Sequence, residues 1–570
     1  MRRRLRAALS WLGGWVRSFP RVVWVVFAAW VGLLSLYSVL VPLYQAPDEP
    51  QHVDLALEVR IGHRYPAYDE AFISERMVAS REQIYFTQGA LDLEAEAAKP
   101  RNQRPGFDEL GGPGPSEYRN QLSAHPPLYS VAMAGVTVVA TNAIPSGGGW
   151  SWDETVGLLR LANVVLSSML VLIAFKAASA LGLHRSAATI ASLFPLAIPE
   201  LAHIGSVVNN DNLLTVAGAL LTVYTIRIAR GDLGWRTALV AGALTGVALL
   251  TKGFALAFPV VVVLAYAPHL WHRVERSKAL LALVQAGAVA LVVGGWWWIA
   301  NLVVHGRLLP AIELIPRAAE GFEPELGAWF ERFWYAINLR YWGAFGWLHV
   351  TIESWQATVA TLAVLVLVVA AFLTGRRRRW ALLVALAPTA LILVIVIQGT
   401  WSAYASTAHF PGMQGRYLFS GVVGLGVVVA AGFAGILRRQ VAWGSVLVWI
   451  GGSLLHAASL WRILDQFWGP PASSATEEVR ALVAFSPWPA PVTYGVVVSA
   501  IVAWVALGAA LISTAVAAAP GPPTDAPGSD AAVGPVRESV SAPAGEGIST
   551  TSAGGSYRAD GLSVEMRGGQ

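Results

Sequence analysis

The chain of 570 residues contains no cysteine and few charged side chains. Without cysteine it can form no disulfide, perform no thiol chemistry and hold no metal through thiolates. Charged residues make up only 13% of the chain against 55% hydrophobic residues, and the mean hydropathy is +0.53. This composition excludes an ordinary soluble domain and indicates a protein that lies mostly within a membrane.

Lysine is scarce as well, since only Lys99, Lys176, Lys252 and Lys278 occur among 40 basic residues, a bias that suits Arg-rich bacterial coding. The formal net charge of +5 does not indicate nucleic-acid binding, because the basic residues lie in short clusters between apolar runs rather than on one face. We therefore expect no nucleic-acid partner and use these clusters as indicators of topology.

Long apolar runs fill most of the chain. Many exceed the roughly 20 residues that a helix needs to cross ~30 Å of hydrocarbon. They lie at about 22–43, 127–144, 157–182, 187–208, 212–229, 237–251, 254–270, 279–301, 355–374, 380–398, 417–436, 443–461 and 493–515. The sequence therefore predicts an all-α polytopic membrane protein.

The two ends of the chain differ from this apolar middle. Residues 1–21 are basic and are expected in the cytoplasm. The run after them is too long for a signal-peptide core, and no cleavage pattern of small residues follows, so we interpret it as a retained first span. The spans then occupy residues 22–515. Residues 516–570, rich in Ala, Gly, Pro and Ser, cannot bury enough apolar surface to fold, which predicts a disordered cytoplasmic tail.

Basic clusters between the spans, such as Arg376–Arg379 and Arg438/Arg439, predict the orientation. If they face the cytoplasm, as the positive-inside bias expects, both termini lie inside and the long polar loops face outward. This pattern requires that residues 127–144 do not cross. That segment is short, bounded by prolines and rich in small residues, which suits a re-entrant or interfacial helix. We expect about 12 crossings, with 13 as the alternative.

The first large outer loop, residues 44–126, begins with the motif Pro47-Asp48-Glu49-Pro50. Two adjacent carboxylates beside water at the outer face of a bilayer can abstract a proton or bind a cation. The alternative interpretation is that the two carboxylates only form a solvated helix end and mark the topology. Because prolines on both sides stiffen the backbone, we favour Asp48 and Glu49 as candidate catalytic residues.

Other polar residues near the outer span ends can bind a substrate. Arg416, on a Gly-loosened loop, can hold phosphate oxygens with two parallel hydrogen bonds, whereas Lys252 either assists or only snorkels to the interface. A lone His is more often structural than a base or a ligand. The candidate substrate-binding residues are His52, His125, Lys252, Arg307, Arg340, Arg416 and Tyr417. No spacing is specific for a metal, so none is assigned, although a divalent metal stays an alternative.

Two further segments have open interpretations. Asn209-Asn210-Asp211 fits a plain turn or a second polar contact, and Arg160 fits a buried partner for an outer carboxylate or an interfacial residue. Aromatic residues are dense at 329–347, within the second large outer loop, 302–354. They fit either an amphipathic helix that rests on the bilayer or a wall for stacking sugars.

Several motifs together resemble known families. They are Pro-Asp-Glu-Pro-x-His after the first span, His-Pro-Pro-Leu-Tyr at the end of the first outer loop, Asn-Asp between spans, Leu-Thr-Lys-Gly in mid-chain, Phe-Gly-Trp-Leu, and Gln-Gly-Arg-Tyr late in the chain. Their order resembles a bacterial family of multi-pass proteins defined as a domain of unknown function. The acidic motif and His-Pro-Pro-Leu are also similar to the GT-C glycosyltransferases, which include protein O-mannosyltransferases and the aminoarabinose transferases of lipid A.

The resemblance, over about residues 20 to 465, implies a GT-C-like helical bundle in the bacterial plasma membrane. GT-C enzymes pass a sugar from a polyprenyl-phosphate carrier to an acceptor at the outer face, with an acidic residue of the first outer loop as the base. By position that residue is Asp48, with Glu49 second. The additional acceptor-site residues of protein O-mannosyltransferases have no match here, so the acceptor stays open among an envelope glycan, a lipid and a protein.

A transporter or flippase of lipid-linked envelope precursors is the competing class, and a polymerase or ligase of lipid-linked glycans is a third. Transporters tend to place ionisable residues and broken helices at the bilayer midplane. Here the charges of interest cluster at the outer span ends, which favours chemistry at the interface.

Overall fold

The structure is a computed structural model, and it describes residues 14–83, 86–87, 90–91, 99–143, 149–310, 315–469 and 474–518. Most of the basic N-terminus and nearly all of the predicted cytoplasmic tail lie outside the described residues.

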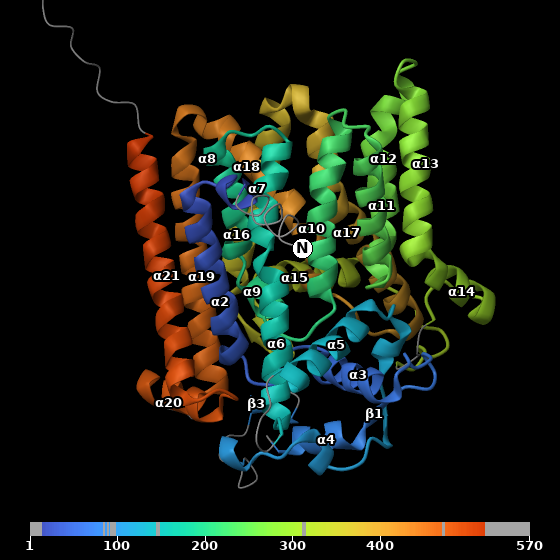
Figure 1. Cartoon of the computed structure of the whole chain (residues 1–570), viewed down its shortest axis with the longest axis vertical. Coiled ribbons are helices and arrows are strands. Elements are labelled where there is room, and N and C mark those ends of the chain that lie inside the picture. The colour runs from blue at the N-terminus through green and yellow to red at the C-terminus, as the bar shows by residue number, and fades with distance from the viewer. Residues whose placement is uncertain are drawn as a thin grey trace, which may run out of the picture. The chain divides into compact units, whose positions relative to one another are not determined.

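Helices dominate the described chain (Figure 1). The apolar segments form α2 Arg21–Leu40, α6 Trp152–Ser168, α7 Leu170–Ala180, α8 Arg185–Leu193, α9 Pro199–Gly205, α10 Asp211–Ala229, α11 Trp235–Leu249, α12 Ala257–Trp271, α13 Arg276–Ala290, α14 Trp296–His305, α16 Ser354–Thr374, α17 Arg379–Thr407, α18 Val422–Leu437, α19 Val441–Phe467 and α21 Ala490–Ala517.

The all-α polytopic class is confirmed. Within the described residues, nine helical segments are long and apolar enough to cross a membrane, or ten if the bent pair Arg185–Ala197 and Pro199–Gly205 makes one span. That pair bends by 72°, so the single apolar run expected at 187–208 is broken. The break lies before Pro199, which supplies no backbone N–H to continue the preceding helix. The expected count of 12 or 13 crossings stays a prediction.

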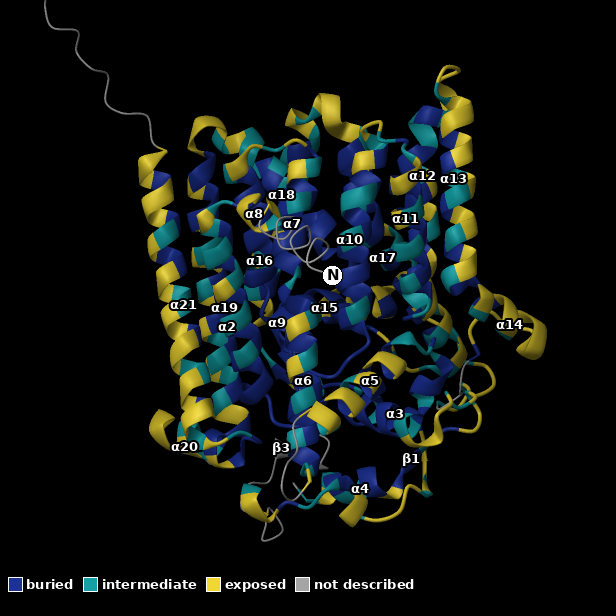
Figure 2. Ribbon diagram, in the orientation of Figure 1, coloured by how far each residue is buried: buried dark blue, intermediate teal, exposed yellow. Residues whose placement is uncertain are grey.

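The outward faces of the peripheral helices are apolar (Figure 2). On α21, for example, Val498, Ile501 and Val505 are exposed, and on α16 Val359, Leu362 and Val366 are exposed. A water-facing helix would carry polar residues there, whereas a helix in hydrocarbon needs none. These faces are therefore the surfaces that meet lipid.

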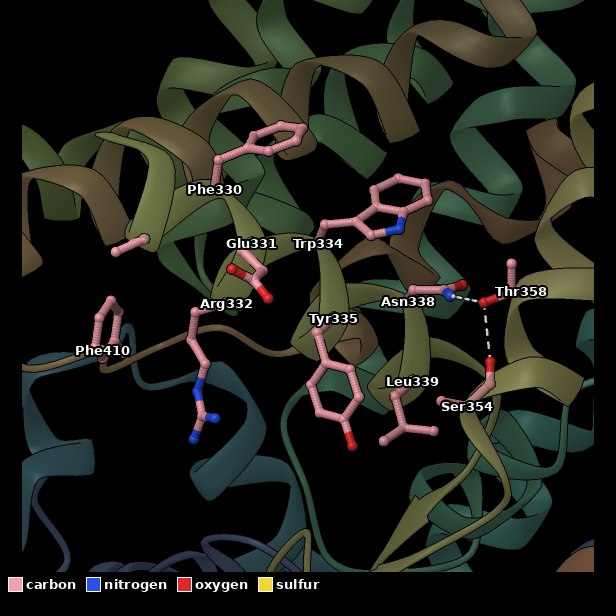
Figure 3. Close-up of a pocket in the computed structure, with 11 residues that line it drawn as sticks. Phe330, Glu331, Arg332, Trp334, Tyr335, Asn338, Leu339, Ser354, Thr358 and Phe410 are labelled. Atoms are coloured by element: carbon pink, nitrogen blue, oxygen red, sulfur yellow. Dashed lines mark hydrogen bonds between the residues drawn. The ribbon is translucent and has the colours of Figure 1, made fainter. Parts of the chain in front are cut away.

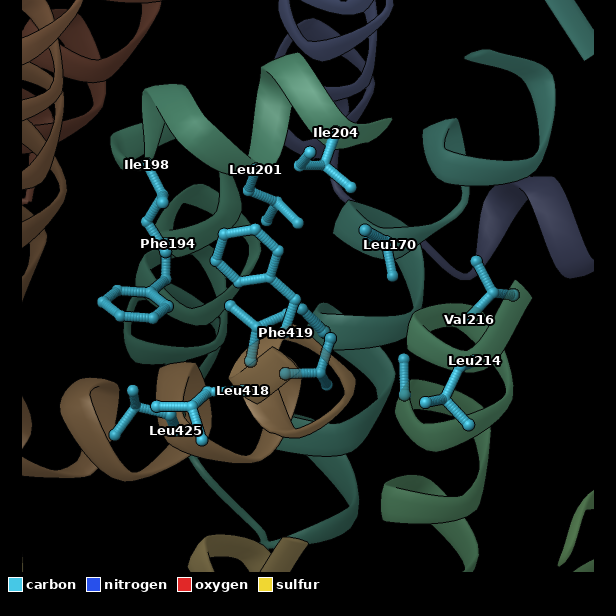
Figure 4. Packing of buried hydrophobic residues seen from close by; sticks show 14 of the residues in the cluster. Leu170, Phe194, Ile198, Leu201, Ile204, Leu214, Val216, Leu418, Phe419 and Leu425 are labelled. Atoms are coloured by element: carbon cyan, nitrogen blue, oxygen red, sulfur yellow. The ribbon is translucent and has the colours of Figure 1, made fainter. Parts of the chain in front are cut away.

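Helix α18 lies at the centre of the packed bundle, where Figure 4 shows its Leu425 among large side chains such as Phe194 and Phe419. Two of its glycines permit close approach of neighbours. A β-carbon on Gly424 would lie 1.9 Å from the carbonyl oxygen of Ala385 in α17, and one on Gly432 would lie 2.1 Å from that of Leu367 in α16. Helices α16 and α17 thus each pack on α18.

The first outer loop folds over one end of the bundle (Figure 1). It contains α3 Glu49–Gly62 and α4 Glu75–Glu82, with short antiparallel pairs of β1 Phe72–Ser74 with β4 Pro115–Arg119 and of β2 Phe86–Thr87 with β3 Ala90–Leu91, and α5 Leu128–Ala143 follows it. The segment expected at 127–144 is α5, which packs on α3 through the rings of Tyr129 and His52, 5.4 Å apart. This placement favours an outer helix over a crossing.

The second outer loop contributes α15 Leu326–Trp342 and a hairpin of β5 Ala344–Phe345 with β6 Val350–Thr351. One face of α15 is buried at Trp329, Phe333 and Tyr341. The rings of Trp334 and Tyr335 on its other face are about half exposed. A further helix, α20 Ala475–Phe485, precedes α21.

Candidate functional site

The turn that follows α2 is strained. Tyr44 has φ 66° and Asp48 has φ 64°, a left-handed conformation that costs L-residues other than glycine about 1–3 kcal/mol. Such a conformation persists only where surrounding contacts fix it. Contacts with other residues must therefore hold residues 44–48 in this conformation.

Glu49 is one of these holders. Its carboxylate is fully buried and accepts hydrogen bonds from the backbone N–H of Tyr44 at 2.9 Å and of Val208 at 3.2 Å. Arg160 of α6 donates to both carboxylate oxygens, from Nε at 2.7 Å and from Nη2 at 2.6 Å. These four donors hold the carboxylate of Glu49 in one orientation.

Arg160 also closes the C-terminal end of α2. Its Nη1 donates to the carbonyl oxygens of Ser38 and Val41 at 2.8 and 2.6 Å, and its Nη2 donates to Pro42 at 3.0 Å. Carbonyls in the last turn of a helix have no partner within the helix, so this guanidinium supplies one inside the protein. The sequence-based interpretation of Arg160 as a buried partner for an outer carboxylate is thus confirmed, and we name the Glu49–Arg160 pair the clamp.

Asp48 points to a different partner. Its Oδ2 accepts a hydrogen bond from Arg416 Nη2 at 2.6 Å, and Arg416 Nη1 lies 3.4 Å from the carbonyl oxygen of Pro47. The Arg416 side chain is 2% exposed, whereas that of Asp48 is 27% exposed. Asp48 therefore combines a fixed charge partner with access from outside.

A second ion pair adjoins the first. Lys252 Nζ lies 2.6 Å from Asp211 Oδ1, and Arg416 Nε lies 3.5 Å from Asp211 Oδ2. The order Asp48, Arg416, Asp211, Lys252 thus alternates negative and positive charges. Lys252 Nζ also lies 5.1 Å from the ring centroid of Tyr417, within cation–π range. We name Asp48, Arg416, Asp211 and Lys252 the charge cluster.

The protonation of the groups outside the spans follows from their surroundings. Burial by itself raises the pKa of Asp48, but the positive charges of Arg416, first, and of Lys252 outweigh it and leave the pKa below its ordinary value. Removal from water lowers the pKa of His125 to about 4, aided by the charge of Lys252, and burial likewise lowers the pKa of His52. At neutral pH the carboxylate is ionised and both rings are neutral.

Several polar atoms of the site have no hydrogen-bond partner within the described chain. They are His52 Nδ1, His125 Nδ1, Asn210 Oδ1, Asp211 Oδ2, Gln414 Oε1 and Arg416 Nε. Buried polar groups normally find partners, so unpaired ones at a single place indicate room for a polar ligand or for ordered water.

Arg340 approaches the site from the second outer loop. It lies near the end of α15, and its Nη1 donates to the carbonyl oxygen of Met413 at 2.7 Å. Among the described residues no carboxylate lies within 4.0 Å of its guanidinium, unlike that of Arg416. Arg340 is thus the cation next to the charge cluster whose charge is not already neutralised.

The sequence-based candidates divide on this evidence. Asp48, His52, His125, Lys252, Arg416 and Tyr417 are brought together, with Arg340 beside them. Arg307 lies on the exposed chain after α14 and takes part in none of the ion pairs just described. Asp211, whose sequence fits a plain turn or a second polar contact, is a full member of the charge cluster. Its membership could not be found from local pattern, because its partners are remote in sequence.

An apolar groove of about 490 Å³ runs between α15, α16, α17 and η8 Gly415–Gly421. It exists because α16 and α17 both pack on α18 and leave a gap between themselves, lined for example by Leu365 and Leu393. Its lining includes Tyr341 and Leu418, which are next in sequence to Arg340 and Tyr417. The groove is therefore lined by α15 and η8, the two elements that also carry Arg340, Arg416 and Tyr417.

No group of three or more His, Asp or Glu residues within the described chain is arranged to hold a metal ion.

The fold and site define a polytopic helical membrane protein with a charge cluster beneath its first outer loop. The sequence matches, over residues 31–425, the family described as "Predicted membrane protein (DUF2142)". The chain belongs to this family, as its motifs indicated. No curated protein matches the chain.

Some solved structures are similar to the chain. ArnT from Cupriavidus metallidurans bound to undecaprenyl phosphate is 16% identical, with 88% of this chain and 78% of that chain covered and a TM-score of 0.42. The Archaeoglobus fulgidus oligosaccharyltransferase in the apo form is 11% identical, with 84% and 56% covered and a TM-score of 0.37. Both belong to the GT-C glycosyltransferases, the superfamily that the acidic motif resembles.

Proposed function

We propose that the protein is an integral-membrane glycosyltransferase of the bacterial plasma membrane, which moves a sugar from a polyprenyl-phosphate carrier to a cell-envelope acceptor at the outer face. One observation carries the proposal: a partly exposed Asp48 is held beside the buried cation Arg416, and the segments that carry Arg340 and Tyr417 also line an apolar groove. A base, cations for a departing phosphate and a groove for a lipid are the three parts that such a transfer needs.

In the proposed reaction Asp48 is the general base. Its carboxylate takes the proton of an acceptor hydroxyl as the oxygen forms a bond to the anomeric carbon of the sugar. The bond from that carbon to the phosphate oxygen breaks, and the electron pair leaves with the polyprenyl phosphate. The αL backbone and Arg416 fix the direction of the carboxylate, which lowers the entropic part of the barrier.

The departing phosphate is expected to meet Arg340 first. Arg416 and Lys252 already face Asp48 and Asp211, so the charge cluster is formally neutral. Arg340 offers a positive charge that no described carboxylate neutralises, and a guanidinium can hold two phosphate oxygens at once. Arg416 and Lys252 then assist through their unused hydrogen-bonding capacity, with His52, His125 and Tyr417 lining the sugar-phosphate region.

The lipid part of the donor fits the apolar groove. Its lining is almost wholly hydrocarbon and its lateral side lies between two lipid-facing helices, so an isoprenoid chain could enter from the bilayer without meeting water. Tyr341 and Leu418 line the groove, and their neighbours in sequence, Arg340 and Tyr417, are polar residues of the site. The same short segments therefore carry the apolar wall and the polar contacts.

Asp48→Asn tests this proposal. The amide keeps the size of the side chain but cannot accept a proton at neutral pH, so transfer from a lipid-linked sugar should fall by about 10²–10⁴-fold. The measurement is turnover by the purified protein supplied with polyprenyl-phosphate sugar. Asp108→Asn, at a carboxylate that is 95% exposed, is the control and should keep the parental rate. Near-parental turnover by Asp48→Asn would remove the catalytic role.

A second candidate function, transport or flipping of a lipid-linked envelope precursor, is favoured by one observation. On the bent segment, Glu200 and His203 are fully buried, with His203 Nδ1 3.5 Å from Glu200 Oε1, and neither ring nitrogen of His203 has a hydrogen-bond partner within the described chain. Ionisable residues at a broken helix are typical of transporters. Retained movement of the lipid by Asp48→Asn, together with its loss in His203→Ala, would favour transport over transfer.

A further inference from the structure

The outer side of α15 borders a large cavity that the proposed chemistry does not use. Its volume is about 1010 Å³, at the upper end of the ~300–1,000 Å³ that small-molecule sites occupy. Arg332 and Tyr335 of α15 extend in the same direction, with Phe410 on one side and Ser354 and Thr358 of α16 on the other (Figure 3). Each wall belongs to the outer end of a span or to an outer loop.

A second cavity of about 270 Å³ continues the first, because Tyr335 and Ser354 line both. Its other walls include Glu353 and, from α19, Arg462 and Gln466. The two cavities therefore form one elongated depression, which we name the outer groove. Its length suits a chain-like ligand better than a single compact one.

The chemistry of the outer groove is mixed. Its charges balance, because two acidic residues, Glu331 and Glu353, are matched by two basic ones, Arg332 and Arg462. Glu353 and Arg462 form an ion pair. Hydroxyl and amide side chains add donors and acceptors in similar measure. Flat aromatic faces complete the lining, with Tyr335 51% exposed.

These properties select among ligand classes. A lipid tail has the apolar groove, which shares Phe330, Trp334 and Asn338 with this cavity but is otherwise lined almost wholly by hydrocarbon. A polyanion would bring like charge against Glu331 and Glu353, which costs affinity. An uncharged saccharide fits both parts, because its hydroxyls donate and accept hydrogen bonds and its apolar ring faces pack on aromatic rings.

The outer groove also leads to the charge cluster. Leu339 lines it, and the next residue, Arg340, contacts Met413. Phe410 lines it as well, on the same short loop that continues to Arg416. A ligand chain in the groove would therefore lie against the two segments that carry Arg340 and Arg416.

We propose that the outer groove binds the acceptor, and that the acceptor is an uncharged saccharide chain. This inference rests on the proposed function. Of the two interpretations of the aromatic residues at 329–347, an amphipathic helix on the bilayer and a wall for stacking sugars, it favours the second.

The test measures saccharide binding directly. The full chain in lipid nanodiscs is applied to an array of uncharged hexose and pentose oligosaccharides, uronic-acid oligosaccharides and peptides. The parent should retain uncharged oligosaccharides. Tyr335→Ala combined with Phe410→Ala should weaken that binding about tenfold or more, whereas Tyr335→Phe, which keeps the flat face, should retain most of it. Trp355→Ala is the matched control, because this ring is 64% exposed beside Ser354 yet lines neither cavity described.

The outcomes separate this inference from the proposed function. Release of the sugar from polyprenyl-phosphate sugar into water, without acceptor, tests the function through the parent and Asp48→Asn. Release that depends on Asp48, with no uncharged oligosaccharide bound or with peptides bound instead, would overturn the saccharide acceptor alone. Binding that depends on Tyr335 and Phe410 without any sugar release would support the groove and contradict the transferase.

Discussion

At the scale of single residues, two adjacent carboxylates have opposite surroundings. Asp48 meets Arg416 and is partly open, whereas Glu49 is fully buried in the clamp with Arg160. The left-handed backbone at Asp48 turns the two side chains toward different partners. Sequence alone identified the pair but could not assign the two roles, because adjacent carboxylates in a loop look alike until the backbone direction is known.

The pH dependence of transfer should report the Asp48–Arg416 pair. Because the pKa of Asp48 lies below its ordinary value, the base stays ionised at neutral and mildly acidic pH, and the acid limb of the rate should lie below the ordinary range of a carboxyl group. Any stability that this pair contributes is likewise present above the unfolded-state pKa and lost as pH falls through the folded one. Arg416→Gln removes the largest lowering influence, so burial should raise the pKa and move the acid limb to higher pH.

The measurement is the pH–rate profile of the parent and of Arg416→Gln. Arg307→Gln is the control, since Arg307 is an exposed outer arginine apart from the charge cluster. An acid limb that stays at the parental pH in Arg416→Gln would show that a group other than Asp48 titrates.

We expect the clamp to stabilise the folded protein and to position Asp48, without itself acting as the base. Glu49→Gln leaves Arg160 as an unpaired buried cation, which typically costs about 3–5 kcal/mol. We expect a lower unfolding temperature and a lower kcat, with the acid limb of the pH profile unchanged because Asp48 still sets it. Thermal unfolding and the pH profile measure these two effects. Glu82→Gln, at an exposed carboxylate, is the control; parental stability with a lost acid limb would instead make Glu49 the titrating base.

At the scale of elements, the apolar groove follows from how two helices, α16 and α17, share one neighbour, α18. Glycines on α18 admit α16 and α17 closely, and the gap between those two helices is the groove. The sequence predicted each apolar run, but it could not predict the groove. Apolar residues that line a ligand site and apolar residues that face lipid have the same composition, as Leu393 and Val394 illustrate.

That pair of neighbours supplies a matched test of lipid binding. Leu393→Trp places a larger ring in the groove and should raise the KM for the polyprenyl-phosphate sugar about tenfold, because the lipid chain and the ring compete for one space. Val394→Trp places the same ring at a position that is 60% exposed on α17 and should leave KM at the parental value. Equal KM values for the two variants would show that the donor lipid lies elsewhere.

At the scale of the whole molecule, the sequence predicted the class, whereas the outer position of the acidic motif stays a prediction. It could not predict that Asp211 completes the charge cluster. That membership depends on contacts between segments far apart along the chain: Asp48 and Arg416 alone are separated by 368 positions. Local pattern limits which residues are polar, whereas only packing decides which polar residues meet.

Orientation in the membrane is the last prediction, because the proposed function requires the site to face outward. Helix α17 separates the basic residues Arg376–Arg379 from Thr407, and its 29 residues span about 43 Å at ~1.5 Å each, more than the ~30 Å of hydrocarbon. If the basic end is cytoplasmic, Thr407 and the outer loops face outward. Single cysteines at Glu109, Glu320 and Thr407 in this cysteine-free chain should react with an impermeant thiol reagent in intact cells. Arg377→Cys, the matched position at the other end of α17, should react only after permeabilisation; its labelling in intact cells would reverse the orientation and place Asp48 on the cytoplasmic side.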